Sequence, residues 1–244
     1  MRAMILAAGL GTRLRPLTND RPKALVEIEG RTLLQITLLR LRSVGIHEVI
    51  VNAHHFADML VNYLKAHDDF GMHIEVSRED ELLDTGGGLK KAHDFFAGEH
   101  EPFLLHNVDV LSSIDLVQMI AAHRERCALA TLAVQHRSSS RQLLFDDHGL
   151  LCGRESHDGQ SEIVRTATQL QPMAFCGIHV ISPEIFGQVP EEGVFSIVPV
   201  YLRLAAEGAM ISAFCADEYY WRDLGKLHSL EQAAADLHTG KVAI

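Results

Sequence analysis

The side chains best suited to chemistry follow the first apolar run of the chain. Gly9 and Gly11 let backbone N–H groups approach a bound anion, because glycine carries no side chain and adopts conformations closed to other residues. Thr12 adds a hydroxyl donor, and Arg13 and Lys23 add fixed positive charge. The opening stretch therefore predicts a loop that holds phosphate groups.

Two better-known phosphate-binding loops do not match this stretch. A dinucleotide fingerprint needs a third glycine three positions after Gly11, where this chain has Leu14. A Walker loop ends in Gly-Lys followed by Ser or Thr, and the stretch has no such ending. A nicotinamide-dependent oxidoreductase is therefore disfavoured, and an ordinary turn between strand and helix, with solvated basic residues, stays the alternative for this loop.

Two aspartates are candidates for holding a metal ion. Asp109 follows a buried strand-like run, and ligands of open α/β sheets gather beyond the carboxyl ends of the strands. Asp223 stands between Trp221 and Leu224, where a carboxylate needs a hydrogen bond or a metal ion. Each aspartate also has a structural interpretation, Asp109 as the cap of the next helix and Asp223 as a hydrogen-bonded buried residue.

A run of glycines forms a further motif, Asp84-Thr85-Gly86-Gly87-Gly88, ahead of a predicted helix over about 88–96. Three consecutive glycines expose backbone without Cβ atoms, so a flat base could pack there. A flexible loop before a capped helix is the alternative interpretation. Asn52, at the end of its predicted strand, is a weaker candidate for the same pocket.

Composition excludes several classes of function. The formal charge of −10, with no basic stripe outside the opening loop, argues against nucleic acid as a partner. The four cysteines are far apart and predict neither a zinc knuckle nor a disulfide framework, which favours a reducing cytoplasm. No apolar stretch reaches ~20 residues and no signal peptide pattern opens the chain, so we expect no membrane partner.

Strand and helix patterns alternate through the first half of the chain, which favours parallel pairing. The fold class that we predict is α/β: a doubly wound, mostly parallel sheet with helices on both faces, in one domain over 1–244. The expected strands of the first half are 4–8, 48–52, 73–76 and 103–106. The expected helices are 32–44, 57–65, 88–96 and 114–125, the last with Ser112 or Ser113 as its N-cap.

The pattern changes after residue 128, where short strand-like runs predict mixed sheet and loops. The polar segment 155–171 is expected to be a mobile loop or a lid over a site. The expected strands are 130–134, 143–145, 149–152, 173–181 and 211–214, and the expected helices are 196–206 and 227–237.

Several motifs together resemble the sugar-1-phosphate nucleotidyltransferase family, and within it the short bacterial N-acetylmuramate-1-phosphate uridylyltransferases. The opening signature is long and specific, and the resemblance covers the whole chain. The motifs are Leu6-Ala7-Ala8-Gly9-Leu10-Gly11-Thr12-Arg13-Leu14, Pro16-Leu17-Thr18, Pro22-Lys23-Ala24-Leu25, Asp84-Thr85-Gly86-Gly87-Gly88, Asn107-Val108-Asp109-Val110, Phe175-Cys176-Gly177-Ile178 and Trp221-Arg222-Asp223-Leu224-Gly225.

The resemblance implies a Rossmann-like fold, with a nucleotide-binding half over about 1–128 and a sugar-binding half over about 129–244. It implies transfer of a nucleotidyl group from a nucleoside triphosphate to a sugar 1-phosphate, with Mg²⁺ held by Asp109 and Asp223. Arg13, Lys23 and Asp109 would be catalytic. The implied nucleotide-binding residues are Leu6, Ala7, Ala8, Gly9, Gly11, Thr12, Arg13, Lys23, Asn52, Gly86 and Gly87, and Gly177 would face the sugar.

The chain departs from the family pattern in two places. Val108 replaces the usual glycine before the metal aspartate. The sugar-phosphate motif Glu-Lys-Pro is replaced by a stretch in which Glu162 and Arg165 are the candidate sugar-binding residues. A mannose-1-phosphate guanylyltransferase and an inactive nucleotide-sensing protein therefore stay as alternatives. The sequence fixes neither base nor sugar, and leaves both a monomer and a homodimer open.

Overall fold

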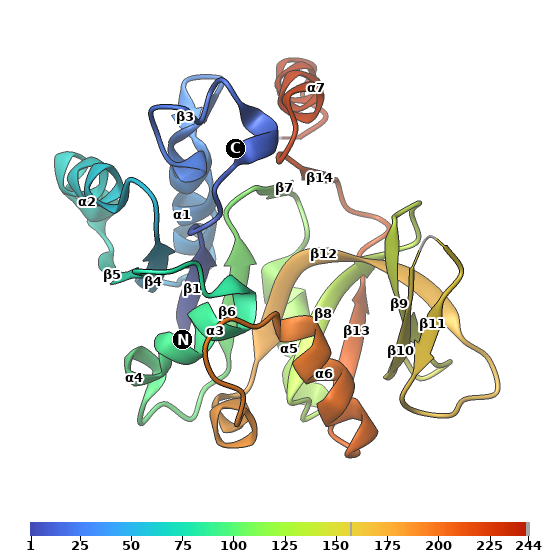
Figure 1. The fold of residues 1–244 in the computed structure, drawn as a ribbon. Coiled ribbons are helices and arrows are strands. Elements are labelled where there is room, and N and C mark those ends of the chain that lie inside the picture. Colours follow the sequence, from blue (N-terminus) through green and yellow to red (C-terminus); the bar gives the residue numbers. More distant parts are fainter. Residues whose placement is uncertain (157, 243–244) are drawn as a thin grey trace.

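A ten-stranded mixed sheet forms the centre of the computed structural model, which describes residues 1–156 and 158–242 (Figure 1). The helices are α1 (Leu33–Ser43), α2 (Ala57–Ala66), α3 (Asp84–Lys91), α4 (His93–Phe96), α5 (Leu116–Glu125), α6 (Ile197–Ala206) and α7 (Leu227–His238). Short 3₁₀ helices cover Thr12–Leu14, Lys23–Leu25, Asp68–Gly71 and Pro183–Gln188.

The strands of the central sheet follow the order β11-β10-β9-β12-β6-β1-β4-β5, with β8 beside β12 and β13 beside β8. Their bounds are β1 (Arg2–Leu6), β4 (Glu48–Ala53), β5 (His73–Arg78), β6 (Phe103–Asn107), β8 (Ala130–Gln135), β9 (Arg141–Phe145), β10 (Leu151–Ser156), β11 (Ser161–Ile163), β12 (Gln171–Ile181) and β13 (Ile211–Cys215). Two small antiparallel sheets pair β2 (Glu27–Ile28) with β3 (Arg31–Thr32), and β7 (Val110–Ser112) with β14 (Trp221–Asp223).

The predicted doubly wound, mostly parallel sheet is confirmed for the first half of the chain. Strands β6, β1, β4 and β5 all run parallel, so their carboxyl ends lie along one edge. Strand β12 then joins β6 in the antiparallel sense, so the sheet continues from the first half of the chain into the second. Residues that follow β1, β4 and β6 therefore meet at the same edge.

Strand β1 shows why the helices cover both faces of the sheet. Successive side chains of a strand point to opposite faces. Ala3 and Ile5 accordingly pack in the core under α1, α2, α5 and α7, while Met4 packs in the core under α3, α4 and α6. All three of these β1 side chains are fully buried, which holds the strand and the loop after it in place.

Two helix starts that the sequence predicted are wrong. Helix α3 begins at Asp84, so the glycine run lies inside a helix and not in a loop before it. Helix α5 begins at Leu116 with Asp115 as its N-cap, whose carboxylate accepts from the Gln118 N–H at 2.9 Å. Ser112, one of the two expected caps, lies in β7.

The polar segment 155–171 contains the end of β10, strand β11 and the first residue of β12; residue 157 lies outside the described residues. The N–H groups of Val164 and Arg165 both donate to Cys152 O, at 2.8 and 3.1 Å, which anchors the segment beside β10. That the segment acts as a lid stays a prediction. Among the helices that the structure describes, none combines the length and apolar character needed to cross a membrane.

Candidate active site

The opening loop turns sharply at Gly11, which adopts a left-handed conformation with φ of +63°. A Cβ atom on this glycine would lie 2.9 Å from Thr18 Cγ2 and 3.0 Å from Lys23 Cβ. The Thr18 hydroxyl also donates to Gly11 O at 2.9 Å, which closes the loop on itself. The glycine is therefore required both by its conformation and by the close approach of Lys23.

Asn52, at the end of β4, anchors the start of this loop. Its Oδ1 accepts from the N–H groups of Ala7, at 2.6 Å, and Ala8, at 3.2 Å. Its Nδ2 donates to Glu79 Oε1 at 2.7 Å, and Glu79 Oε2 accepts from Leu83 N at 3.1 Å. The loop conformation is therefore fixed by a buried network that reaches across three strands.

This network refines the prediction for the opening loop. The N–H groups of Ala7 and Ala8 are already bonded to Asn52, whereas those of Gly9, Leu10 and Gly11 make no hydrogen bond to the residues the structure describes. These three amides follow the carboxyl end of β1, where an anion can be held by the backbone. Glu79 is not among the predicted site residues: it directly follows β5 in the structure, but it lies three positions beyond the end of the strand predicted over 73–76.

Lys23 and Asp109 form the central charged pair of the site. The Lys23 ammonium group contacts Asp109 Oδ2, and the two side chains are 11% and 18% exposed. Asp109 O accepts from Leu224 N at 2.8 Å, and Asp223 lies opposite Val110 in the pairing of β14 with β7. The two aspartates predicted as metal ligands are thus brought to adjacent, paired segments.

Arg13 reaches the same place from the opening loop. A Cβ atom on Gly225 would lie 2.7 Å from Arg13 Nη2 and 2.7 Å from Asp223 Oδ1. Asp223 Oδ1 also accepts from Gly225 N at 2.6 Å. The missing side chain at Gly225 lets the guanidinium group and the carboxylate converge.

The donor set fits a hard divalent cation. Asp109 and Asp223 supply carboxylate oxygens, the ligands that Mg²⁺ takes from proteins together with substrate phosphates and water. The ammonium group of Lys23 already places positive charge against Asp109. The chemistry of the two carboxylates therefore suits Mg²⁺, and their role as its ligands stays a prediction.

Beside this charged pair lies a cavity of about 470 Å³. Part of its wall is apolar, which suits a nucleobase, and Val108 is one of the apolar lining residues. The lining residues are Leu6, Ala8, Gly9, Lys23, Asn52, Glu79, Leu82, Asp84, Thr85, Asn107, Val108, Asp109 and Val194.

The prediction that Gly86 and Gly87 face the nucleobase is not supported by this geometry. Both lie inside α3, and their N–H groups donate to Phe195 O at 2.9 and 3.1 Å. A Cβ atom would lie 2.4 Å from the Phe195 ring at Gly86 and 2.4 Å from Gly193 O at Gly87. The glycines let segment 193–195 pack against the helix, while Asp84 and Thr85 line the cavity.

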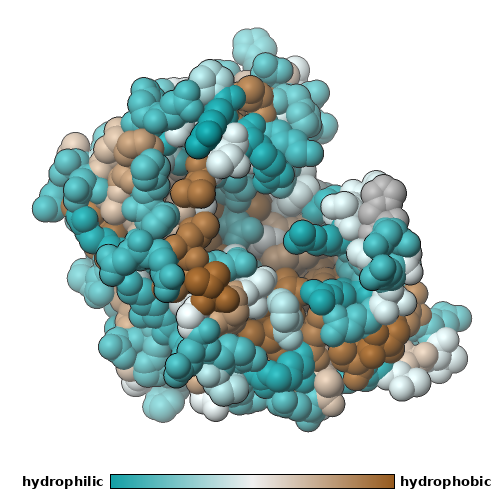
Figure 2. All heavy atoms as spheres, in the orientation of Figure 1, coloured by the Kyte–Doolittle hydropathy of each residue, from teal (hydrophilic) through white to brown (hydrophobic). Residues whose placement is uncertain are grey.

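A second cavity, of about 1030 Å³, is lined mostly by residues of the second half of the chain, and Figure 2 shows this face of the molecule hollowed between its two halves. Arg13 lines it together with Glu162, a predicted sugar-binding residue. Glu162 forms an ion pair with Arg154 at 2.8 Å. The lining residues are Arg13, Ser139, Ser140, Arg141, Gln142, Leu143, Arg154, Glu155, Ser156, Gln160, Ser161, Glu162, Phe175, Ser196, Val198 and Pro199.

The other two predicted sugar-binding residues lie elsewhere. Arg165 Nη2 donates to Ala205 O at 3.1 Å and Ala209 O at 3.0 Å, so it binds carbonyl groups at and just after the end of α6, and its role as a sugar ligand stays a prediction. Gly177 has φ of +74°, and a Cβ atom there would lie 2.7 Å from Asn107 Nδ2. Gly177 makes room for Asn107, which lines the first cavity.

Arg137 and Trp221 hold β14 against the sheet. The guanidinium carbon of Arg137 lies 3.7 Å from the centre of the Trp221 ring, and Arg137 Nη2 donates to Phe175 O at 2.7 Å. Trp221 Nε1 donates to Cys176 O at 2.7 Å. Burial lowers the pKa of Arg137. These contacts fix the strand that carries Asp223.

Comparison with known proteins agrees with this geometry. Residues 2–142 match the family model described as nucleotidyl transferase. The chain belongs to this family. The N-acetylmuramate alpha-1-phosphate uridylyltransferase of Caulobacter vibrioides is 37% identical over 232 residues, which cover 91% of each chain.

More distant family members act on other sugars. The UTP--glucose-1-phosphate uridylyltransferase of Synechocystis is 29% identical over 96% of this chain, and the mannose-1-phosphate guanylyltransferase 1 of Arabidopsis thaliana is 27% identical over 93%. The chain spans 62% of the length of each of these two relatives. The family and its relatives support sugar-1-phosphate nucleotidyl transfer as the activity.

Solved structures confirm the fold. A UDP-glucose pyrophosphorylase in complex with UDP-glucose superposes with a TM-score of 0.76 at 17% identity, covering 98% of each chain. HddC of Yersinia pseudotuberculosis, in complex with GMP-PN, superposes with a TM-score of 0.75 at 21% identity, covering 97% of this chain and 99% of that chain. The Rossmann-like nucleotidyltransferase architecture predicted from the sequence is confirmed.

Proposed function

We propose that the protein transfers the uridylyl group of UTP to N-acetylmuramate 1-phosphate, giving the nucleotide-sugar and pyrophosphate, in a Mg²⁺-dependent reaction. The observation that carries this proposal is the 37% identity with the Caulobacter uridylyltransferase over 91% of both chains. The free cysteines of the described chain support a reducing, cytoplasmic location.

The first cavity is the site for the nucleotide. Its apolar wall accommodates the base, and the amides of Gly9, Leu10 and Gly11 face the region where β1 ends. Arg13 supplies charge for the β- and γ-phosphates and the departing pyrophosphate. A loop of free amides with fixed cations binds phosphate oxygens without rearrangement, which lowers the cost of positioning the triphosphate.

The reaction needs no protein base. The second ionisation of a phosphate monoester lies near pH ~6, so the sugar phosphate carries its attacking charge at neutral pH. Lys23, between the opening loop and Asp109, is placed to bridge the two reacting phosphates and offset their repulsion. Mg²⁺ held by Asp109 and Asp223 would supply further charge neutralisation. The protein itself contributes the orientation of the substrates and the electrostatic stabilisation of the reacting phosphates.

The second cavity suits an acidic sugar phosphate. Arg13, Arg141 and Arg154 all border it, together with serine hydroxyls. Arg154 is paired with Glu162, whereas the Arg141 side chain makes no hydrogen bond to the described residues. N-acetylmuramate carries a lactyl carboxylate that N-acetylglucosamine lacks, and Arg141 is an available partner for it.

A pyrophosphate-release panel tests the proposal. It combines UTP, GTP, CTP and dTTP with the 1-phosphates of N-acetylmuramate, N-acetylglucosamine, glucose and mannose, each with Mg²⁺ and with a chelator. We expect the highest kcat/KM for UTP with N-acetylmuramate 1-phosphate, and no pyrophosphate release from any pair in the presence of the chelator. A preference for GTP with mannose 1-phosphate would replace the proposed substrates, and silence of every pair in a protein that binds UTP would identify a sensor.

A further inference from the structure

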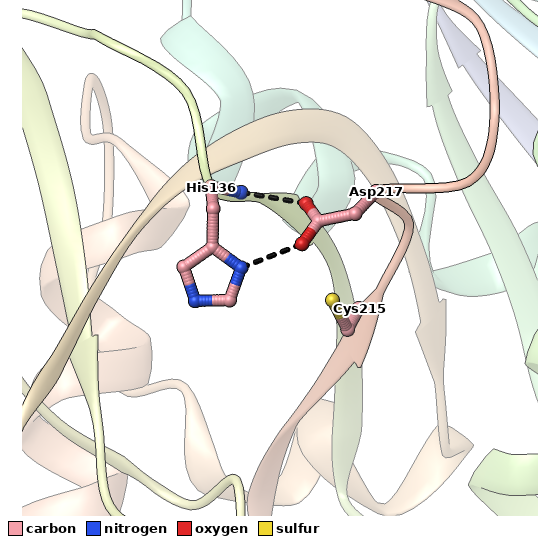
Figure 3. Close-up of side chains that lie close together, drawn as sticks. All are labelled: His136, Cys215 and Asp217. Carbon is pink, nitrogen blue, oxygen red and sulfur yellow. Dashed lines mark hydrogen bonds and ion pairs between the residues drawn. The ribbon is translucent and has the colours of Figure 1, made fainter.

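A cluster outside the nucleotide and sugar cavities gathers three different donor groups. The imidazole of His136, the thiol of Cys215 and the carboxylate of Asp217 each offer an atom, and these atoms lie within 4.8 Å of one another (Figure 3). The three residues are exposed, so an ion and water can reach them. Among the described residues this is the one such group of three.

The backbone holds the three donors in register. Strands β8 and β13 run parallel with Cys215 beside Val134, and His136 directly follows β8. Ala216 N donates to Val134 O at 2.8 Å, which ties the segment after β13 to the end of β8. The donors therefore sit on the ends of two paired strands and not on independent loops.

Asp217 already orients His136. The His136 N–H donates to Asp217 Oδ1 at 2.7 Å, and Nδ1 lies 2.7 Å from Asp217 Oδ2. Figure 3 shows both contacts and places the Cys215 sulfur beside the carboxylate. The imidazole nitrogen, the carboxylate oxygen and the thiol thus turn toward one small volume that a single ion can share.

We propose that His136, Cys215 and Asp217 bind a zinc-like divalent transition-metal ion, separate from the Mg²⁺ proposed at Asp109 and Asp223. Nitrogen, sulfur and carboxylate oxygen are the donors that zinc takes from proteins, whereas Mg²⁺ takes oxygen. Tetrahedral bonds of about 2.0–2.3 Å place neighbouring donors about 3.3–3.8 Å apart. Binding therefore moves Nδ1 and Oδ2 apart from 2.7 Å, and the longest separation in the cluster, at most 4.8 Å, needs to shorten by no more than about 1–1.5 Å. Water completes the fourth position.

Binding replaces one contact and releases one proton. The ion enters between His136 Nδ1 and Asp217 Oδ2 and takes the place of their hydrogen bond, and the proton of that bond moves from Nδ1 to Nε2, so that the neutral imidazole offers the Nδ1 lone pair. The backbone N–H of His136 keeps its bond to Oδ1. Cys215 loses its thiol proton to solvent and binds as thiolate. The bound ion links the end of β8 to the segment that leads to β14, so it stabilises the fold without entering the reaction.

Titration of the full-length protein with Co²⁺ in place of zinc tests this site. Cobalt bound to a thiolate shows a sulfur-to-metal charge-transfer band, which the oxygen ligands Asp109 and Asp223 cannot give. We expect the band in the wild type, in Asp109→Asn and in Cys127→Ser, which removes the other exposed cysteine. We expect Cys215→Ser to abolish the band, and Asp217→Asn to weaken cobalt binding by ~10–100-fold.

Thermal unfolding gives a second readout that does not depend on the band. Zn²⁺ should raise the Tm of the wild type and of Cys127→Ser, because an ion that binds only the folded state stabilises it, and should leave the Tm of His136→Ala unchanged. The Tm of each variant without metal shows whether it folds normally. No band in the wild type, a band that persists in Cys215→Ser, or a band lost in Cys127→Ser overturns the proposal.

Discussion

Asn52 and Glu79 form a buried pair in which the Asn52 side-chain amide donates to Glu79 Oε1 at 2.7 Å. Asn52 is 3% exposed and Glu79 is 4% exposed. The pair fixes the orientation of the amide, so that Asn52 Oδ1 faces the N–H groups of Ala7 and Ala8. Asn52 thus connects a buried carboxylate to the loop that we propose holds the triphosphate.

Replacing Asn52 tests this connection. Asn52→Ala leaves buried amides of the loop and one Glu79 oxygen without their partner, and we expect it to lower the free energy of unfolding by about 1–3 kcal/mol. The loop also loses its anchor, so the KM for the nucleotide should rise. Urea unfolding and steady-state kinetics measure the two effects. Asn19→Ala, at an exposed position of the same loop, is the control and should change neither.

Lys23 and Asp109 should be essential for turnover and dispensable for folding. Lys23→Ala or Asp109→Asn removes a charged group from the proposed reaction centre, and we expect kcat/KM to fall by at least ~100-fold. The Tm should show that each variant is folded. Lys65→Ala, at an exposed position near the end of α2, should keep normal kinetics. Near-normal turnover in either site variant would remove these residues from the mechanism.

Arg141 should distinguish an acidic sugar from a neutral one. If its guanidinium group pairs with the lactyl carboxylate, Arg141→Ala should raise the KM for N-acetylmuramate 1-phosphate by ~10–100-fold, the scale of a lost charged hydrogen bond. The weaker reaction with N-acetylglucosamine 1-phosphate should be unchanged. Arg78→Ala, which removes an exposed arginine paired with Asp58, serves as the control. An equal rise in KM for both sugar phosphates would indicate that Arg141 binds the phosphate group, which both substrates carry.

Sequence patterns predicted the sheet and the charged centre because both depend on order along the chain. Asp109 follows a buried strand, and the carboxyl ends of parallel strands share an edge, so its place near the opening loop could be inferred. The contacts of Arg165 could not be predicted because its partners, the carbonyl groups of Ala205 and Ala209, lie about forty residues away along the chain. No local pattern reveals such a partner.

The start of α3 shows that helix propensity, which is also a local property, fails to predict a structure that long-range contacts decide. Glycine is unfavourable inside a helix by roughly 0.8–1 kcal/mol, so a run of three predicts a loop. Packing against segment 193–195 overrides that preference, because only glycine lets Phe195 and Gly193 approach the helix backbone so closely. The long-range contact decides the structure, and the sequence around residue 86 carries no sign of it.

Gly87→Ala measures that packing directly. The new methyl group would meet Gly193 O, a backbone atom that cannot rotate away, and overpacking of this kind costs about 1–3 kcal/mol. Alanine regains up to about 1 kcal/mol of helix propensity, so we expect a net destabilisation in urea unfolding. Gly187→Ala, where a Cβ atom meets nothing within 4 Å, is the matched control. Equal stability of the two variants would contradict the packing explanation.

Buried neutral histidines should make the fold sensitive to mild acid. Burial lowers the pKa of His106 to about 3, of His123 to about 4 and of His179 to about 3. Unfolding returns each group to a pKa of about 6.5, so below that pH the unfolded state binds more protons than the folded state. Stability should therefore fall as the pH drops from ~6.5 toward ~4, by up to about 1.4 kcal/mol per pH unit for each histidine.

His123→Gln isolates one of these contributions. His123 contacts the hydroxyl groups of Thr131 and Ser182 at 2.9 and 3.0 Å, and a glutamine amide can bond to both without titrating. Urea unfolding between pH ~4.5 and ~6.5 measures the slope of the unfolding free energy against pH. In His123→Gln this slope should decrease by up to about 1.4 kcal/mol per pH unit, which corresponds to the uptake of one proton. His100→Gln, at an exposed position, should keep the wild-type slope. An unchanged slope in His123→Gln would mean that this histidine is protonated in the folded state.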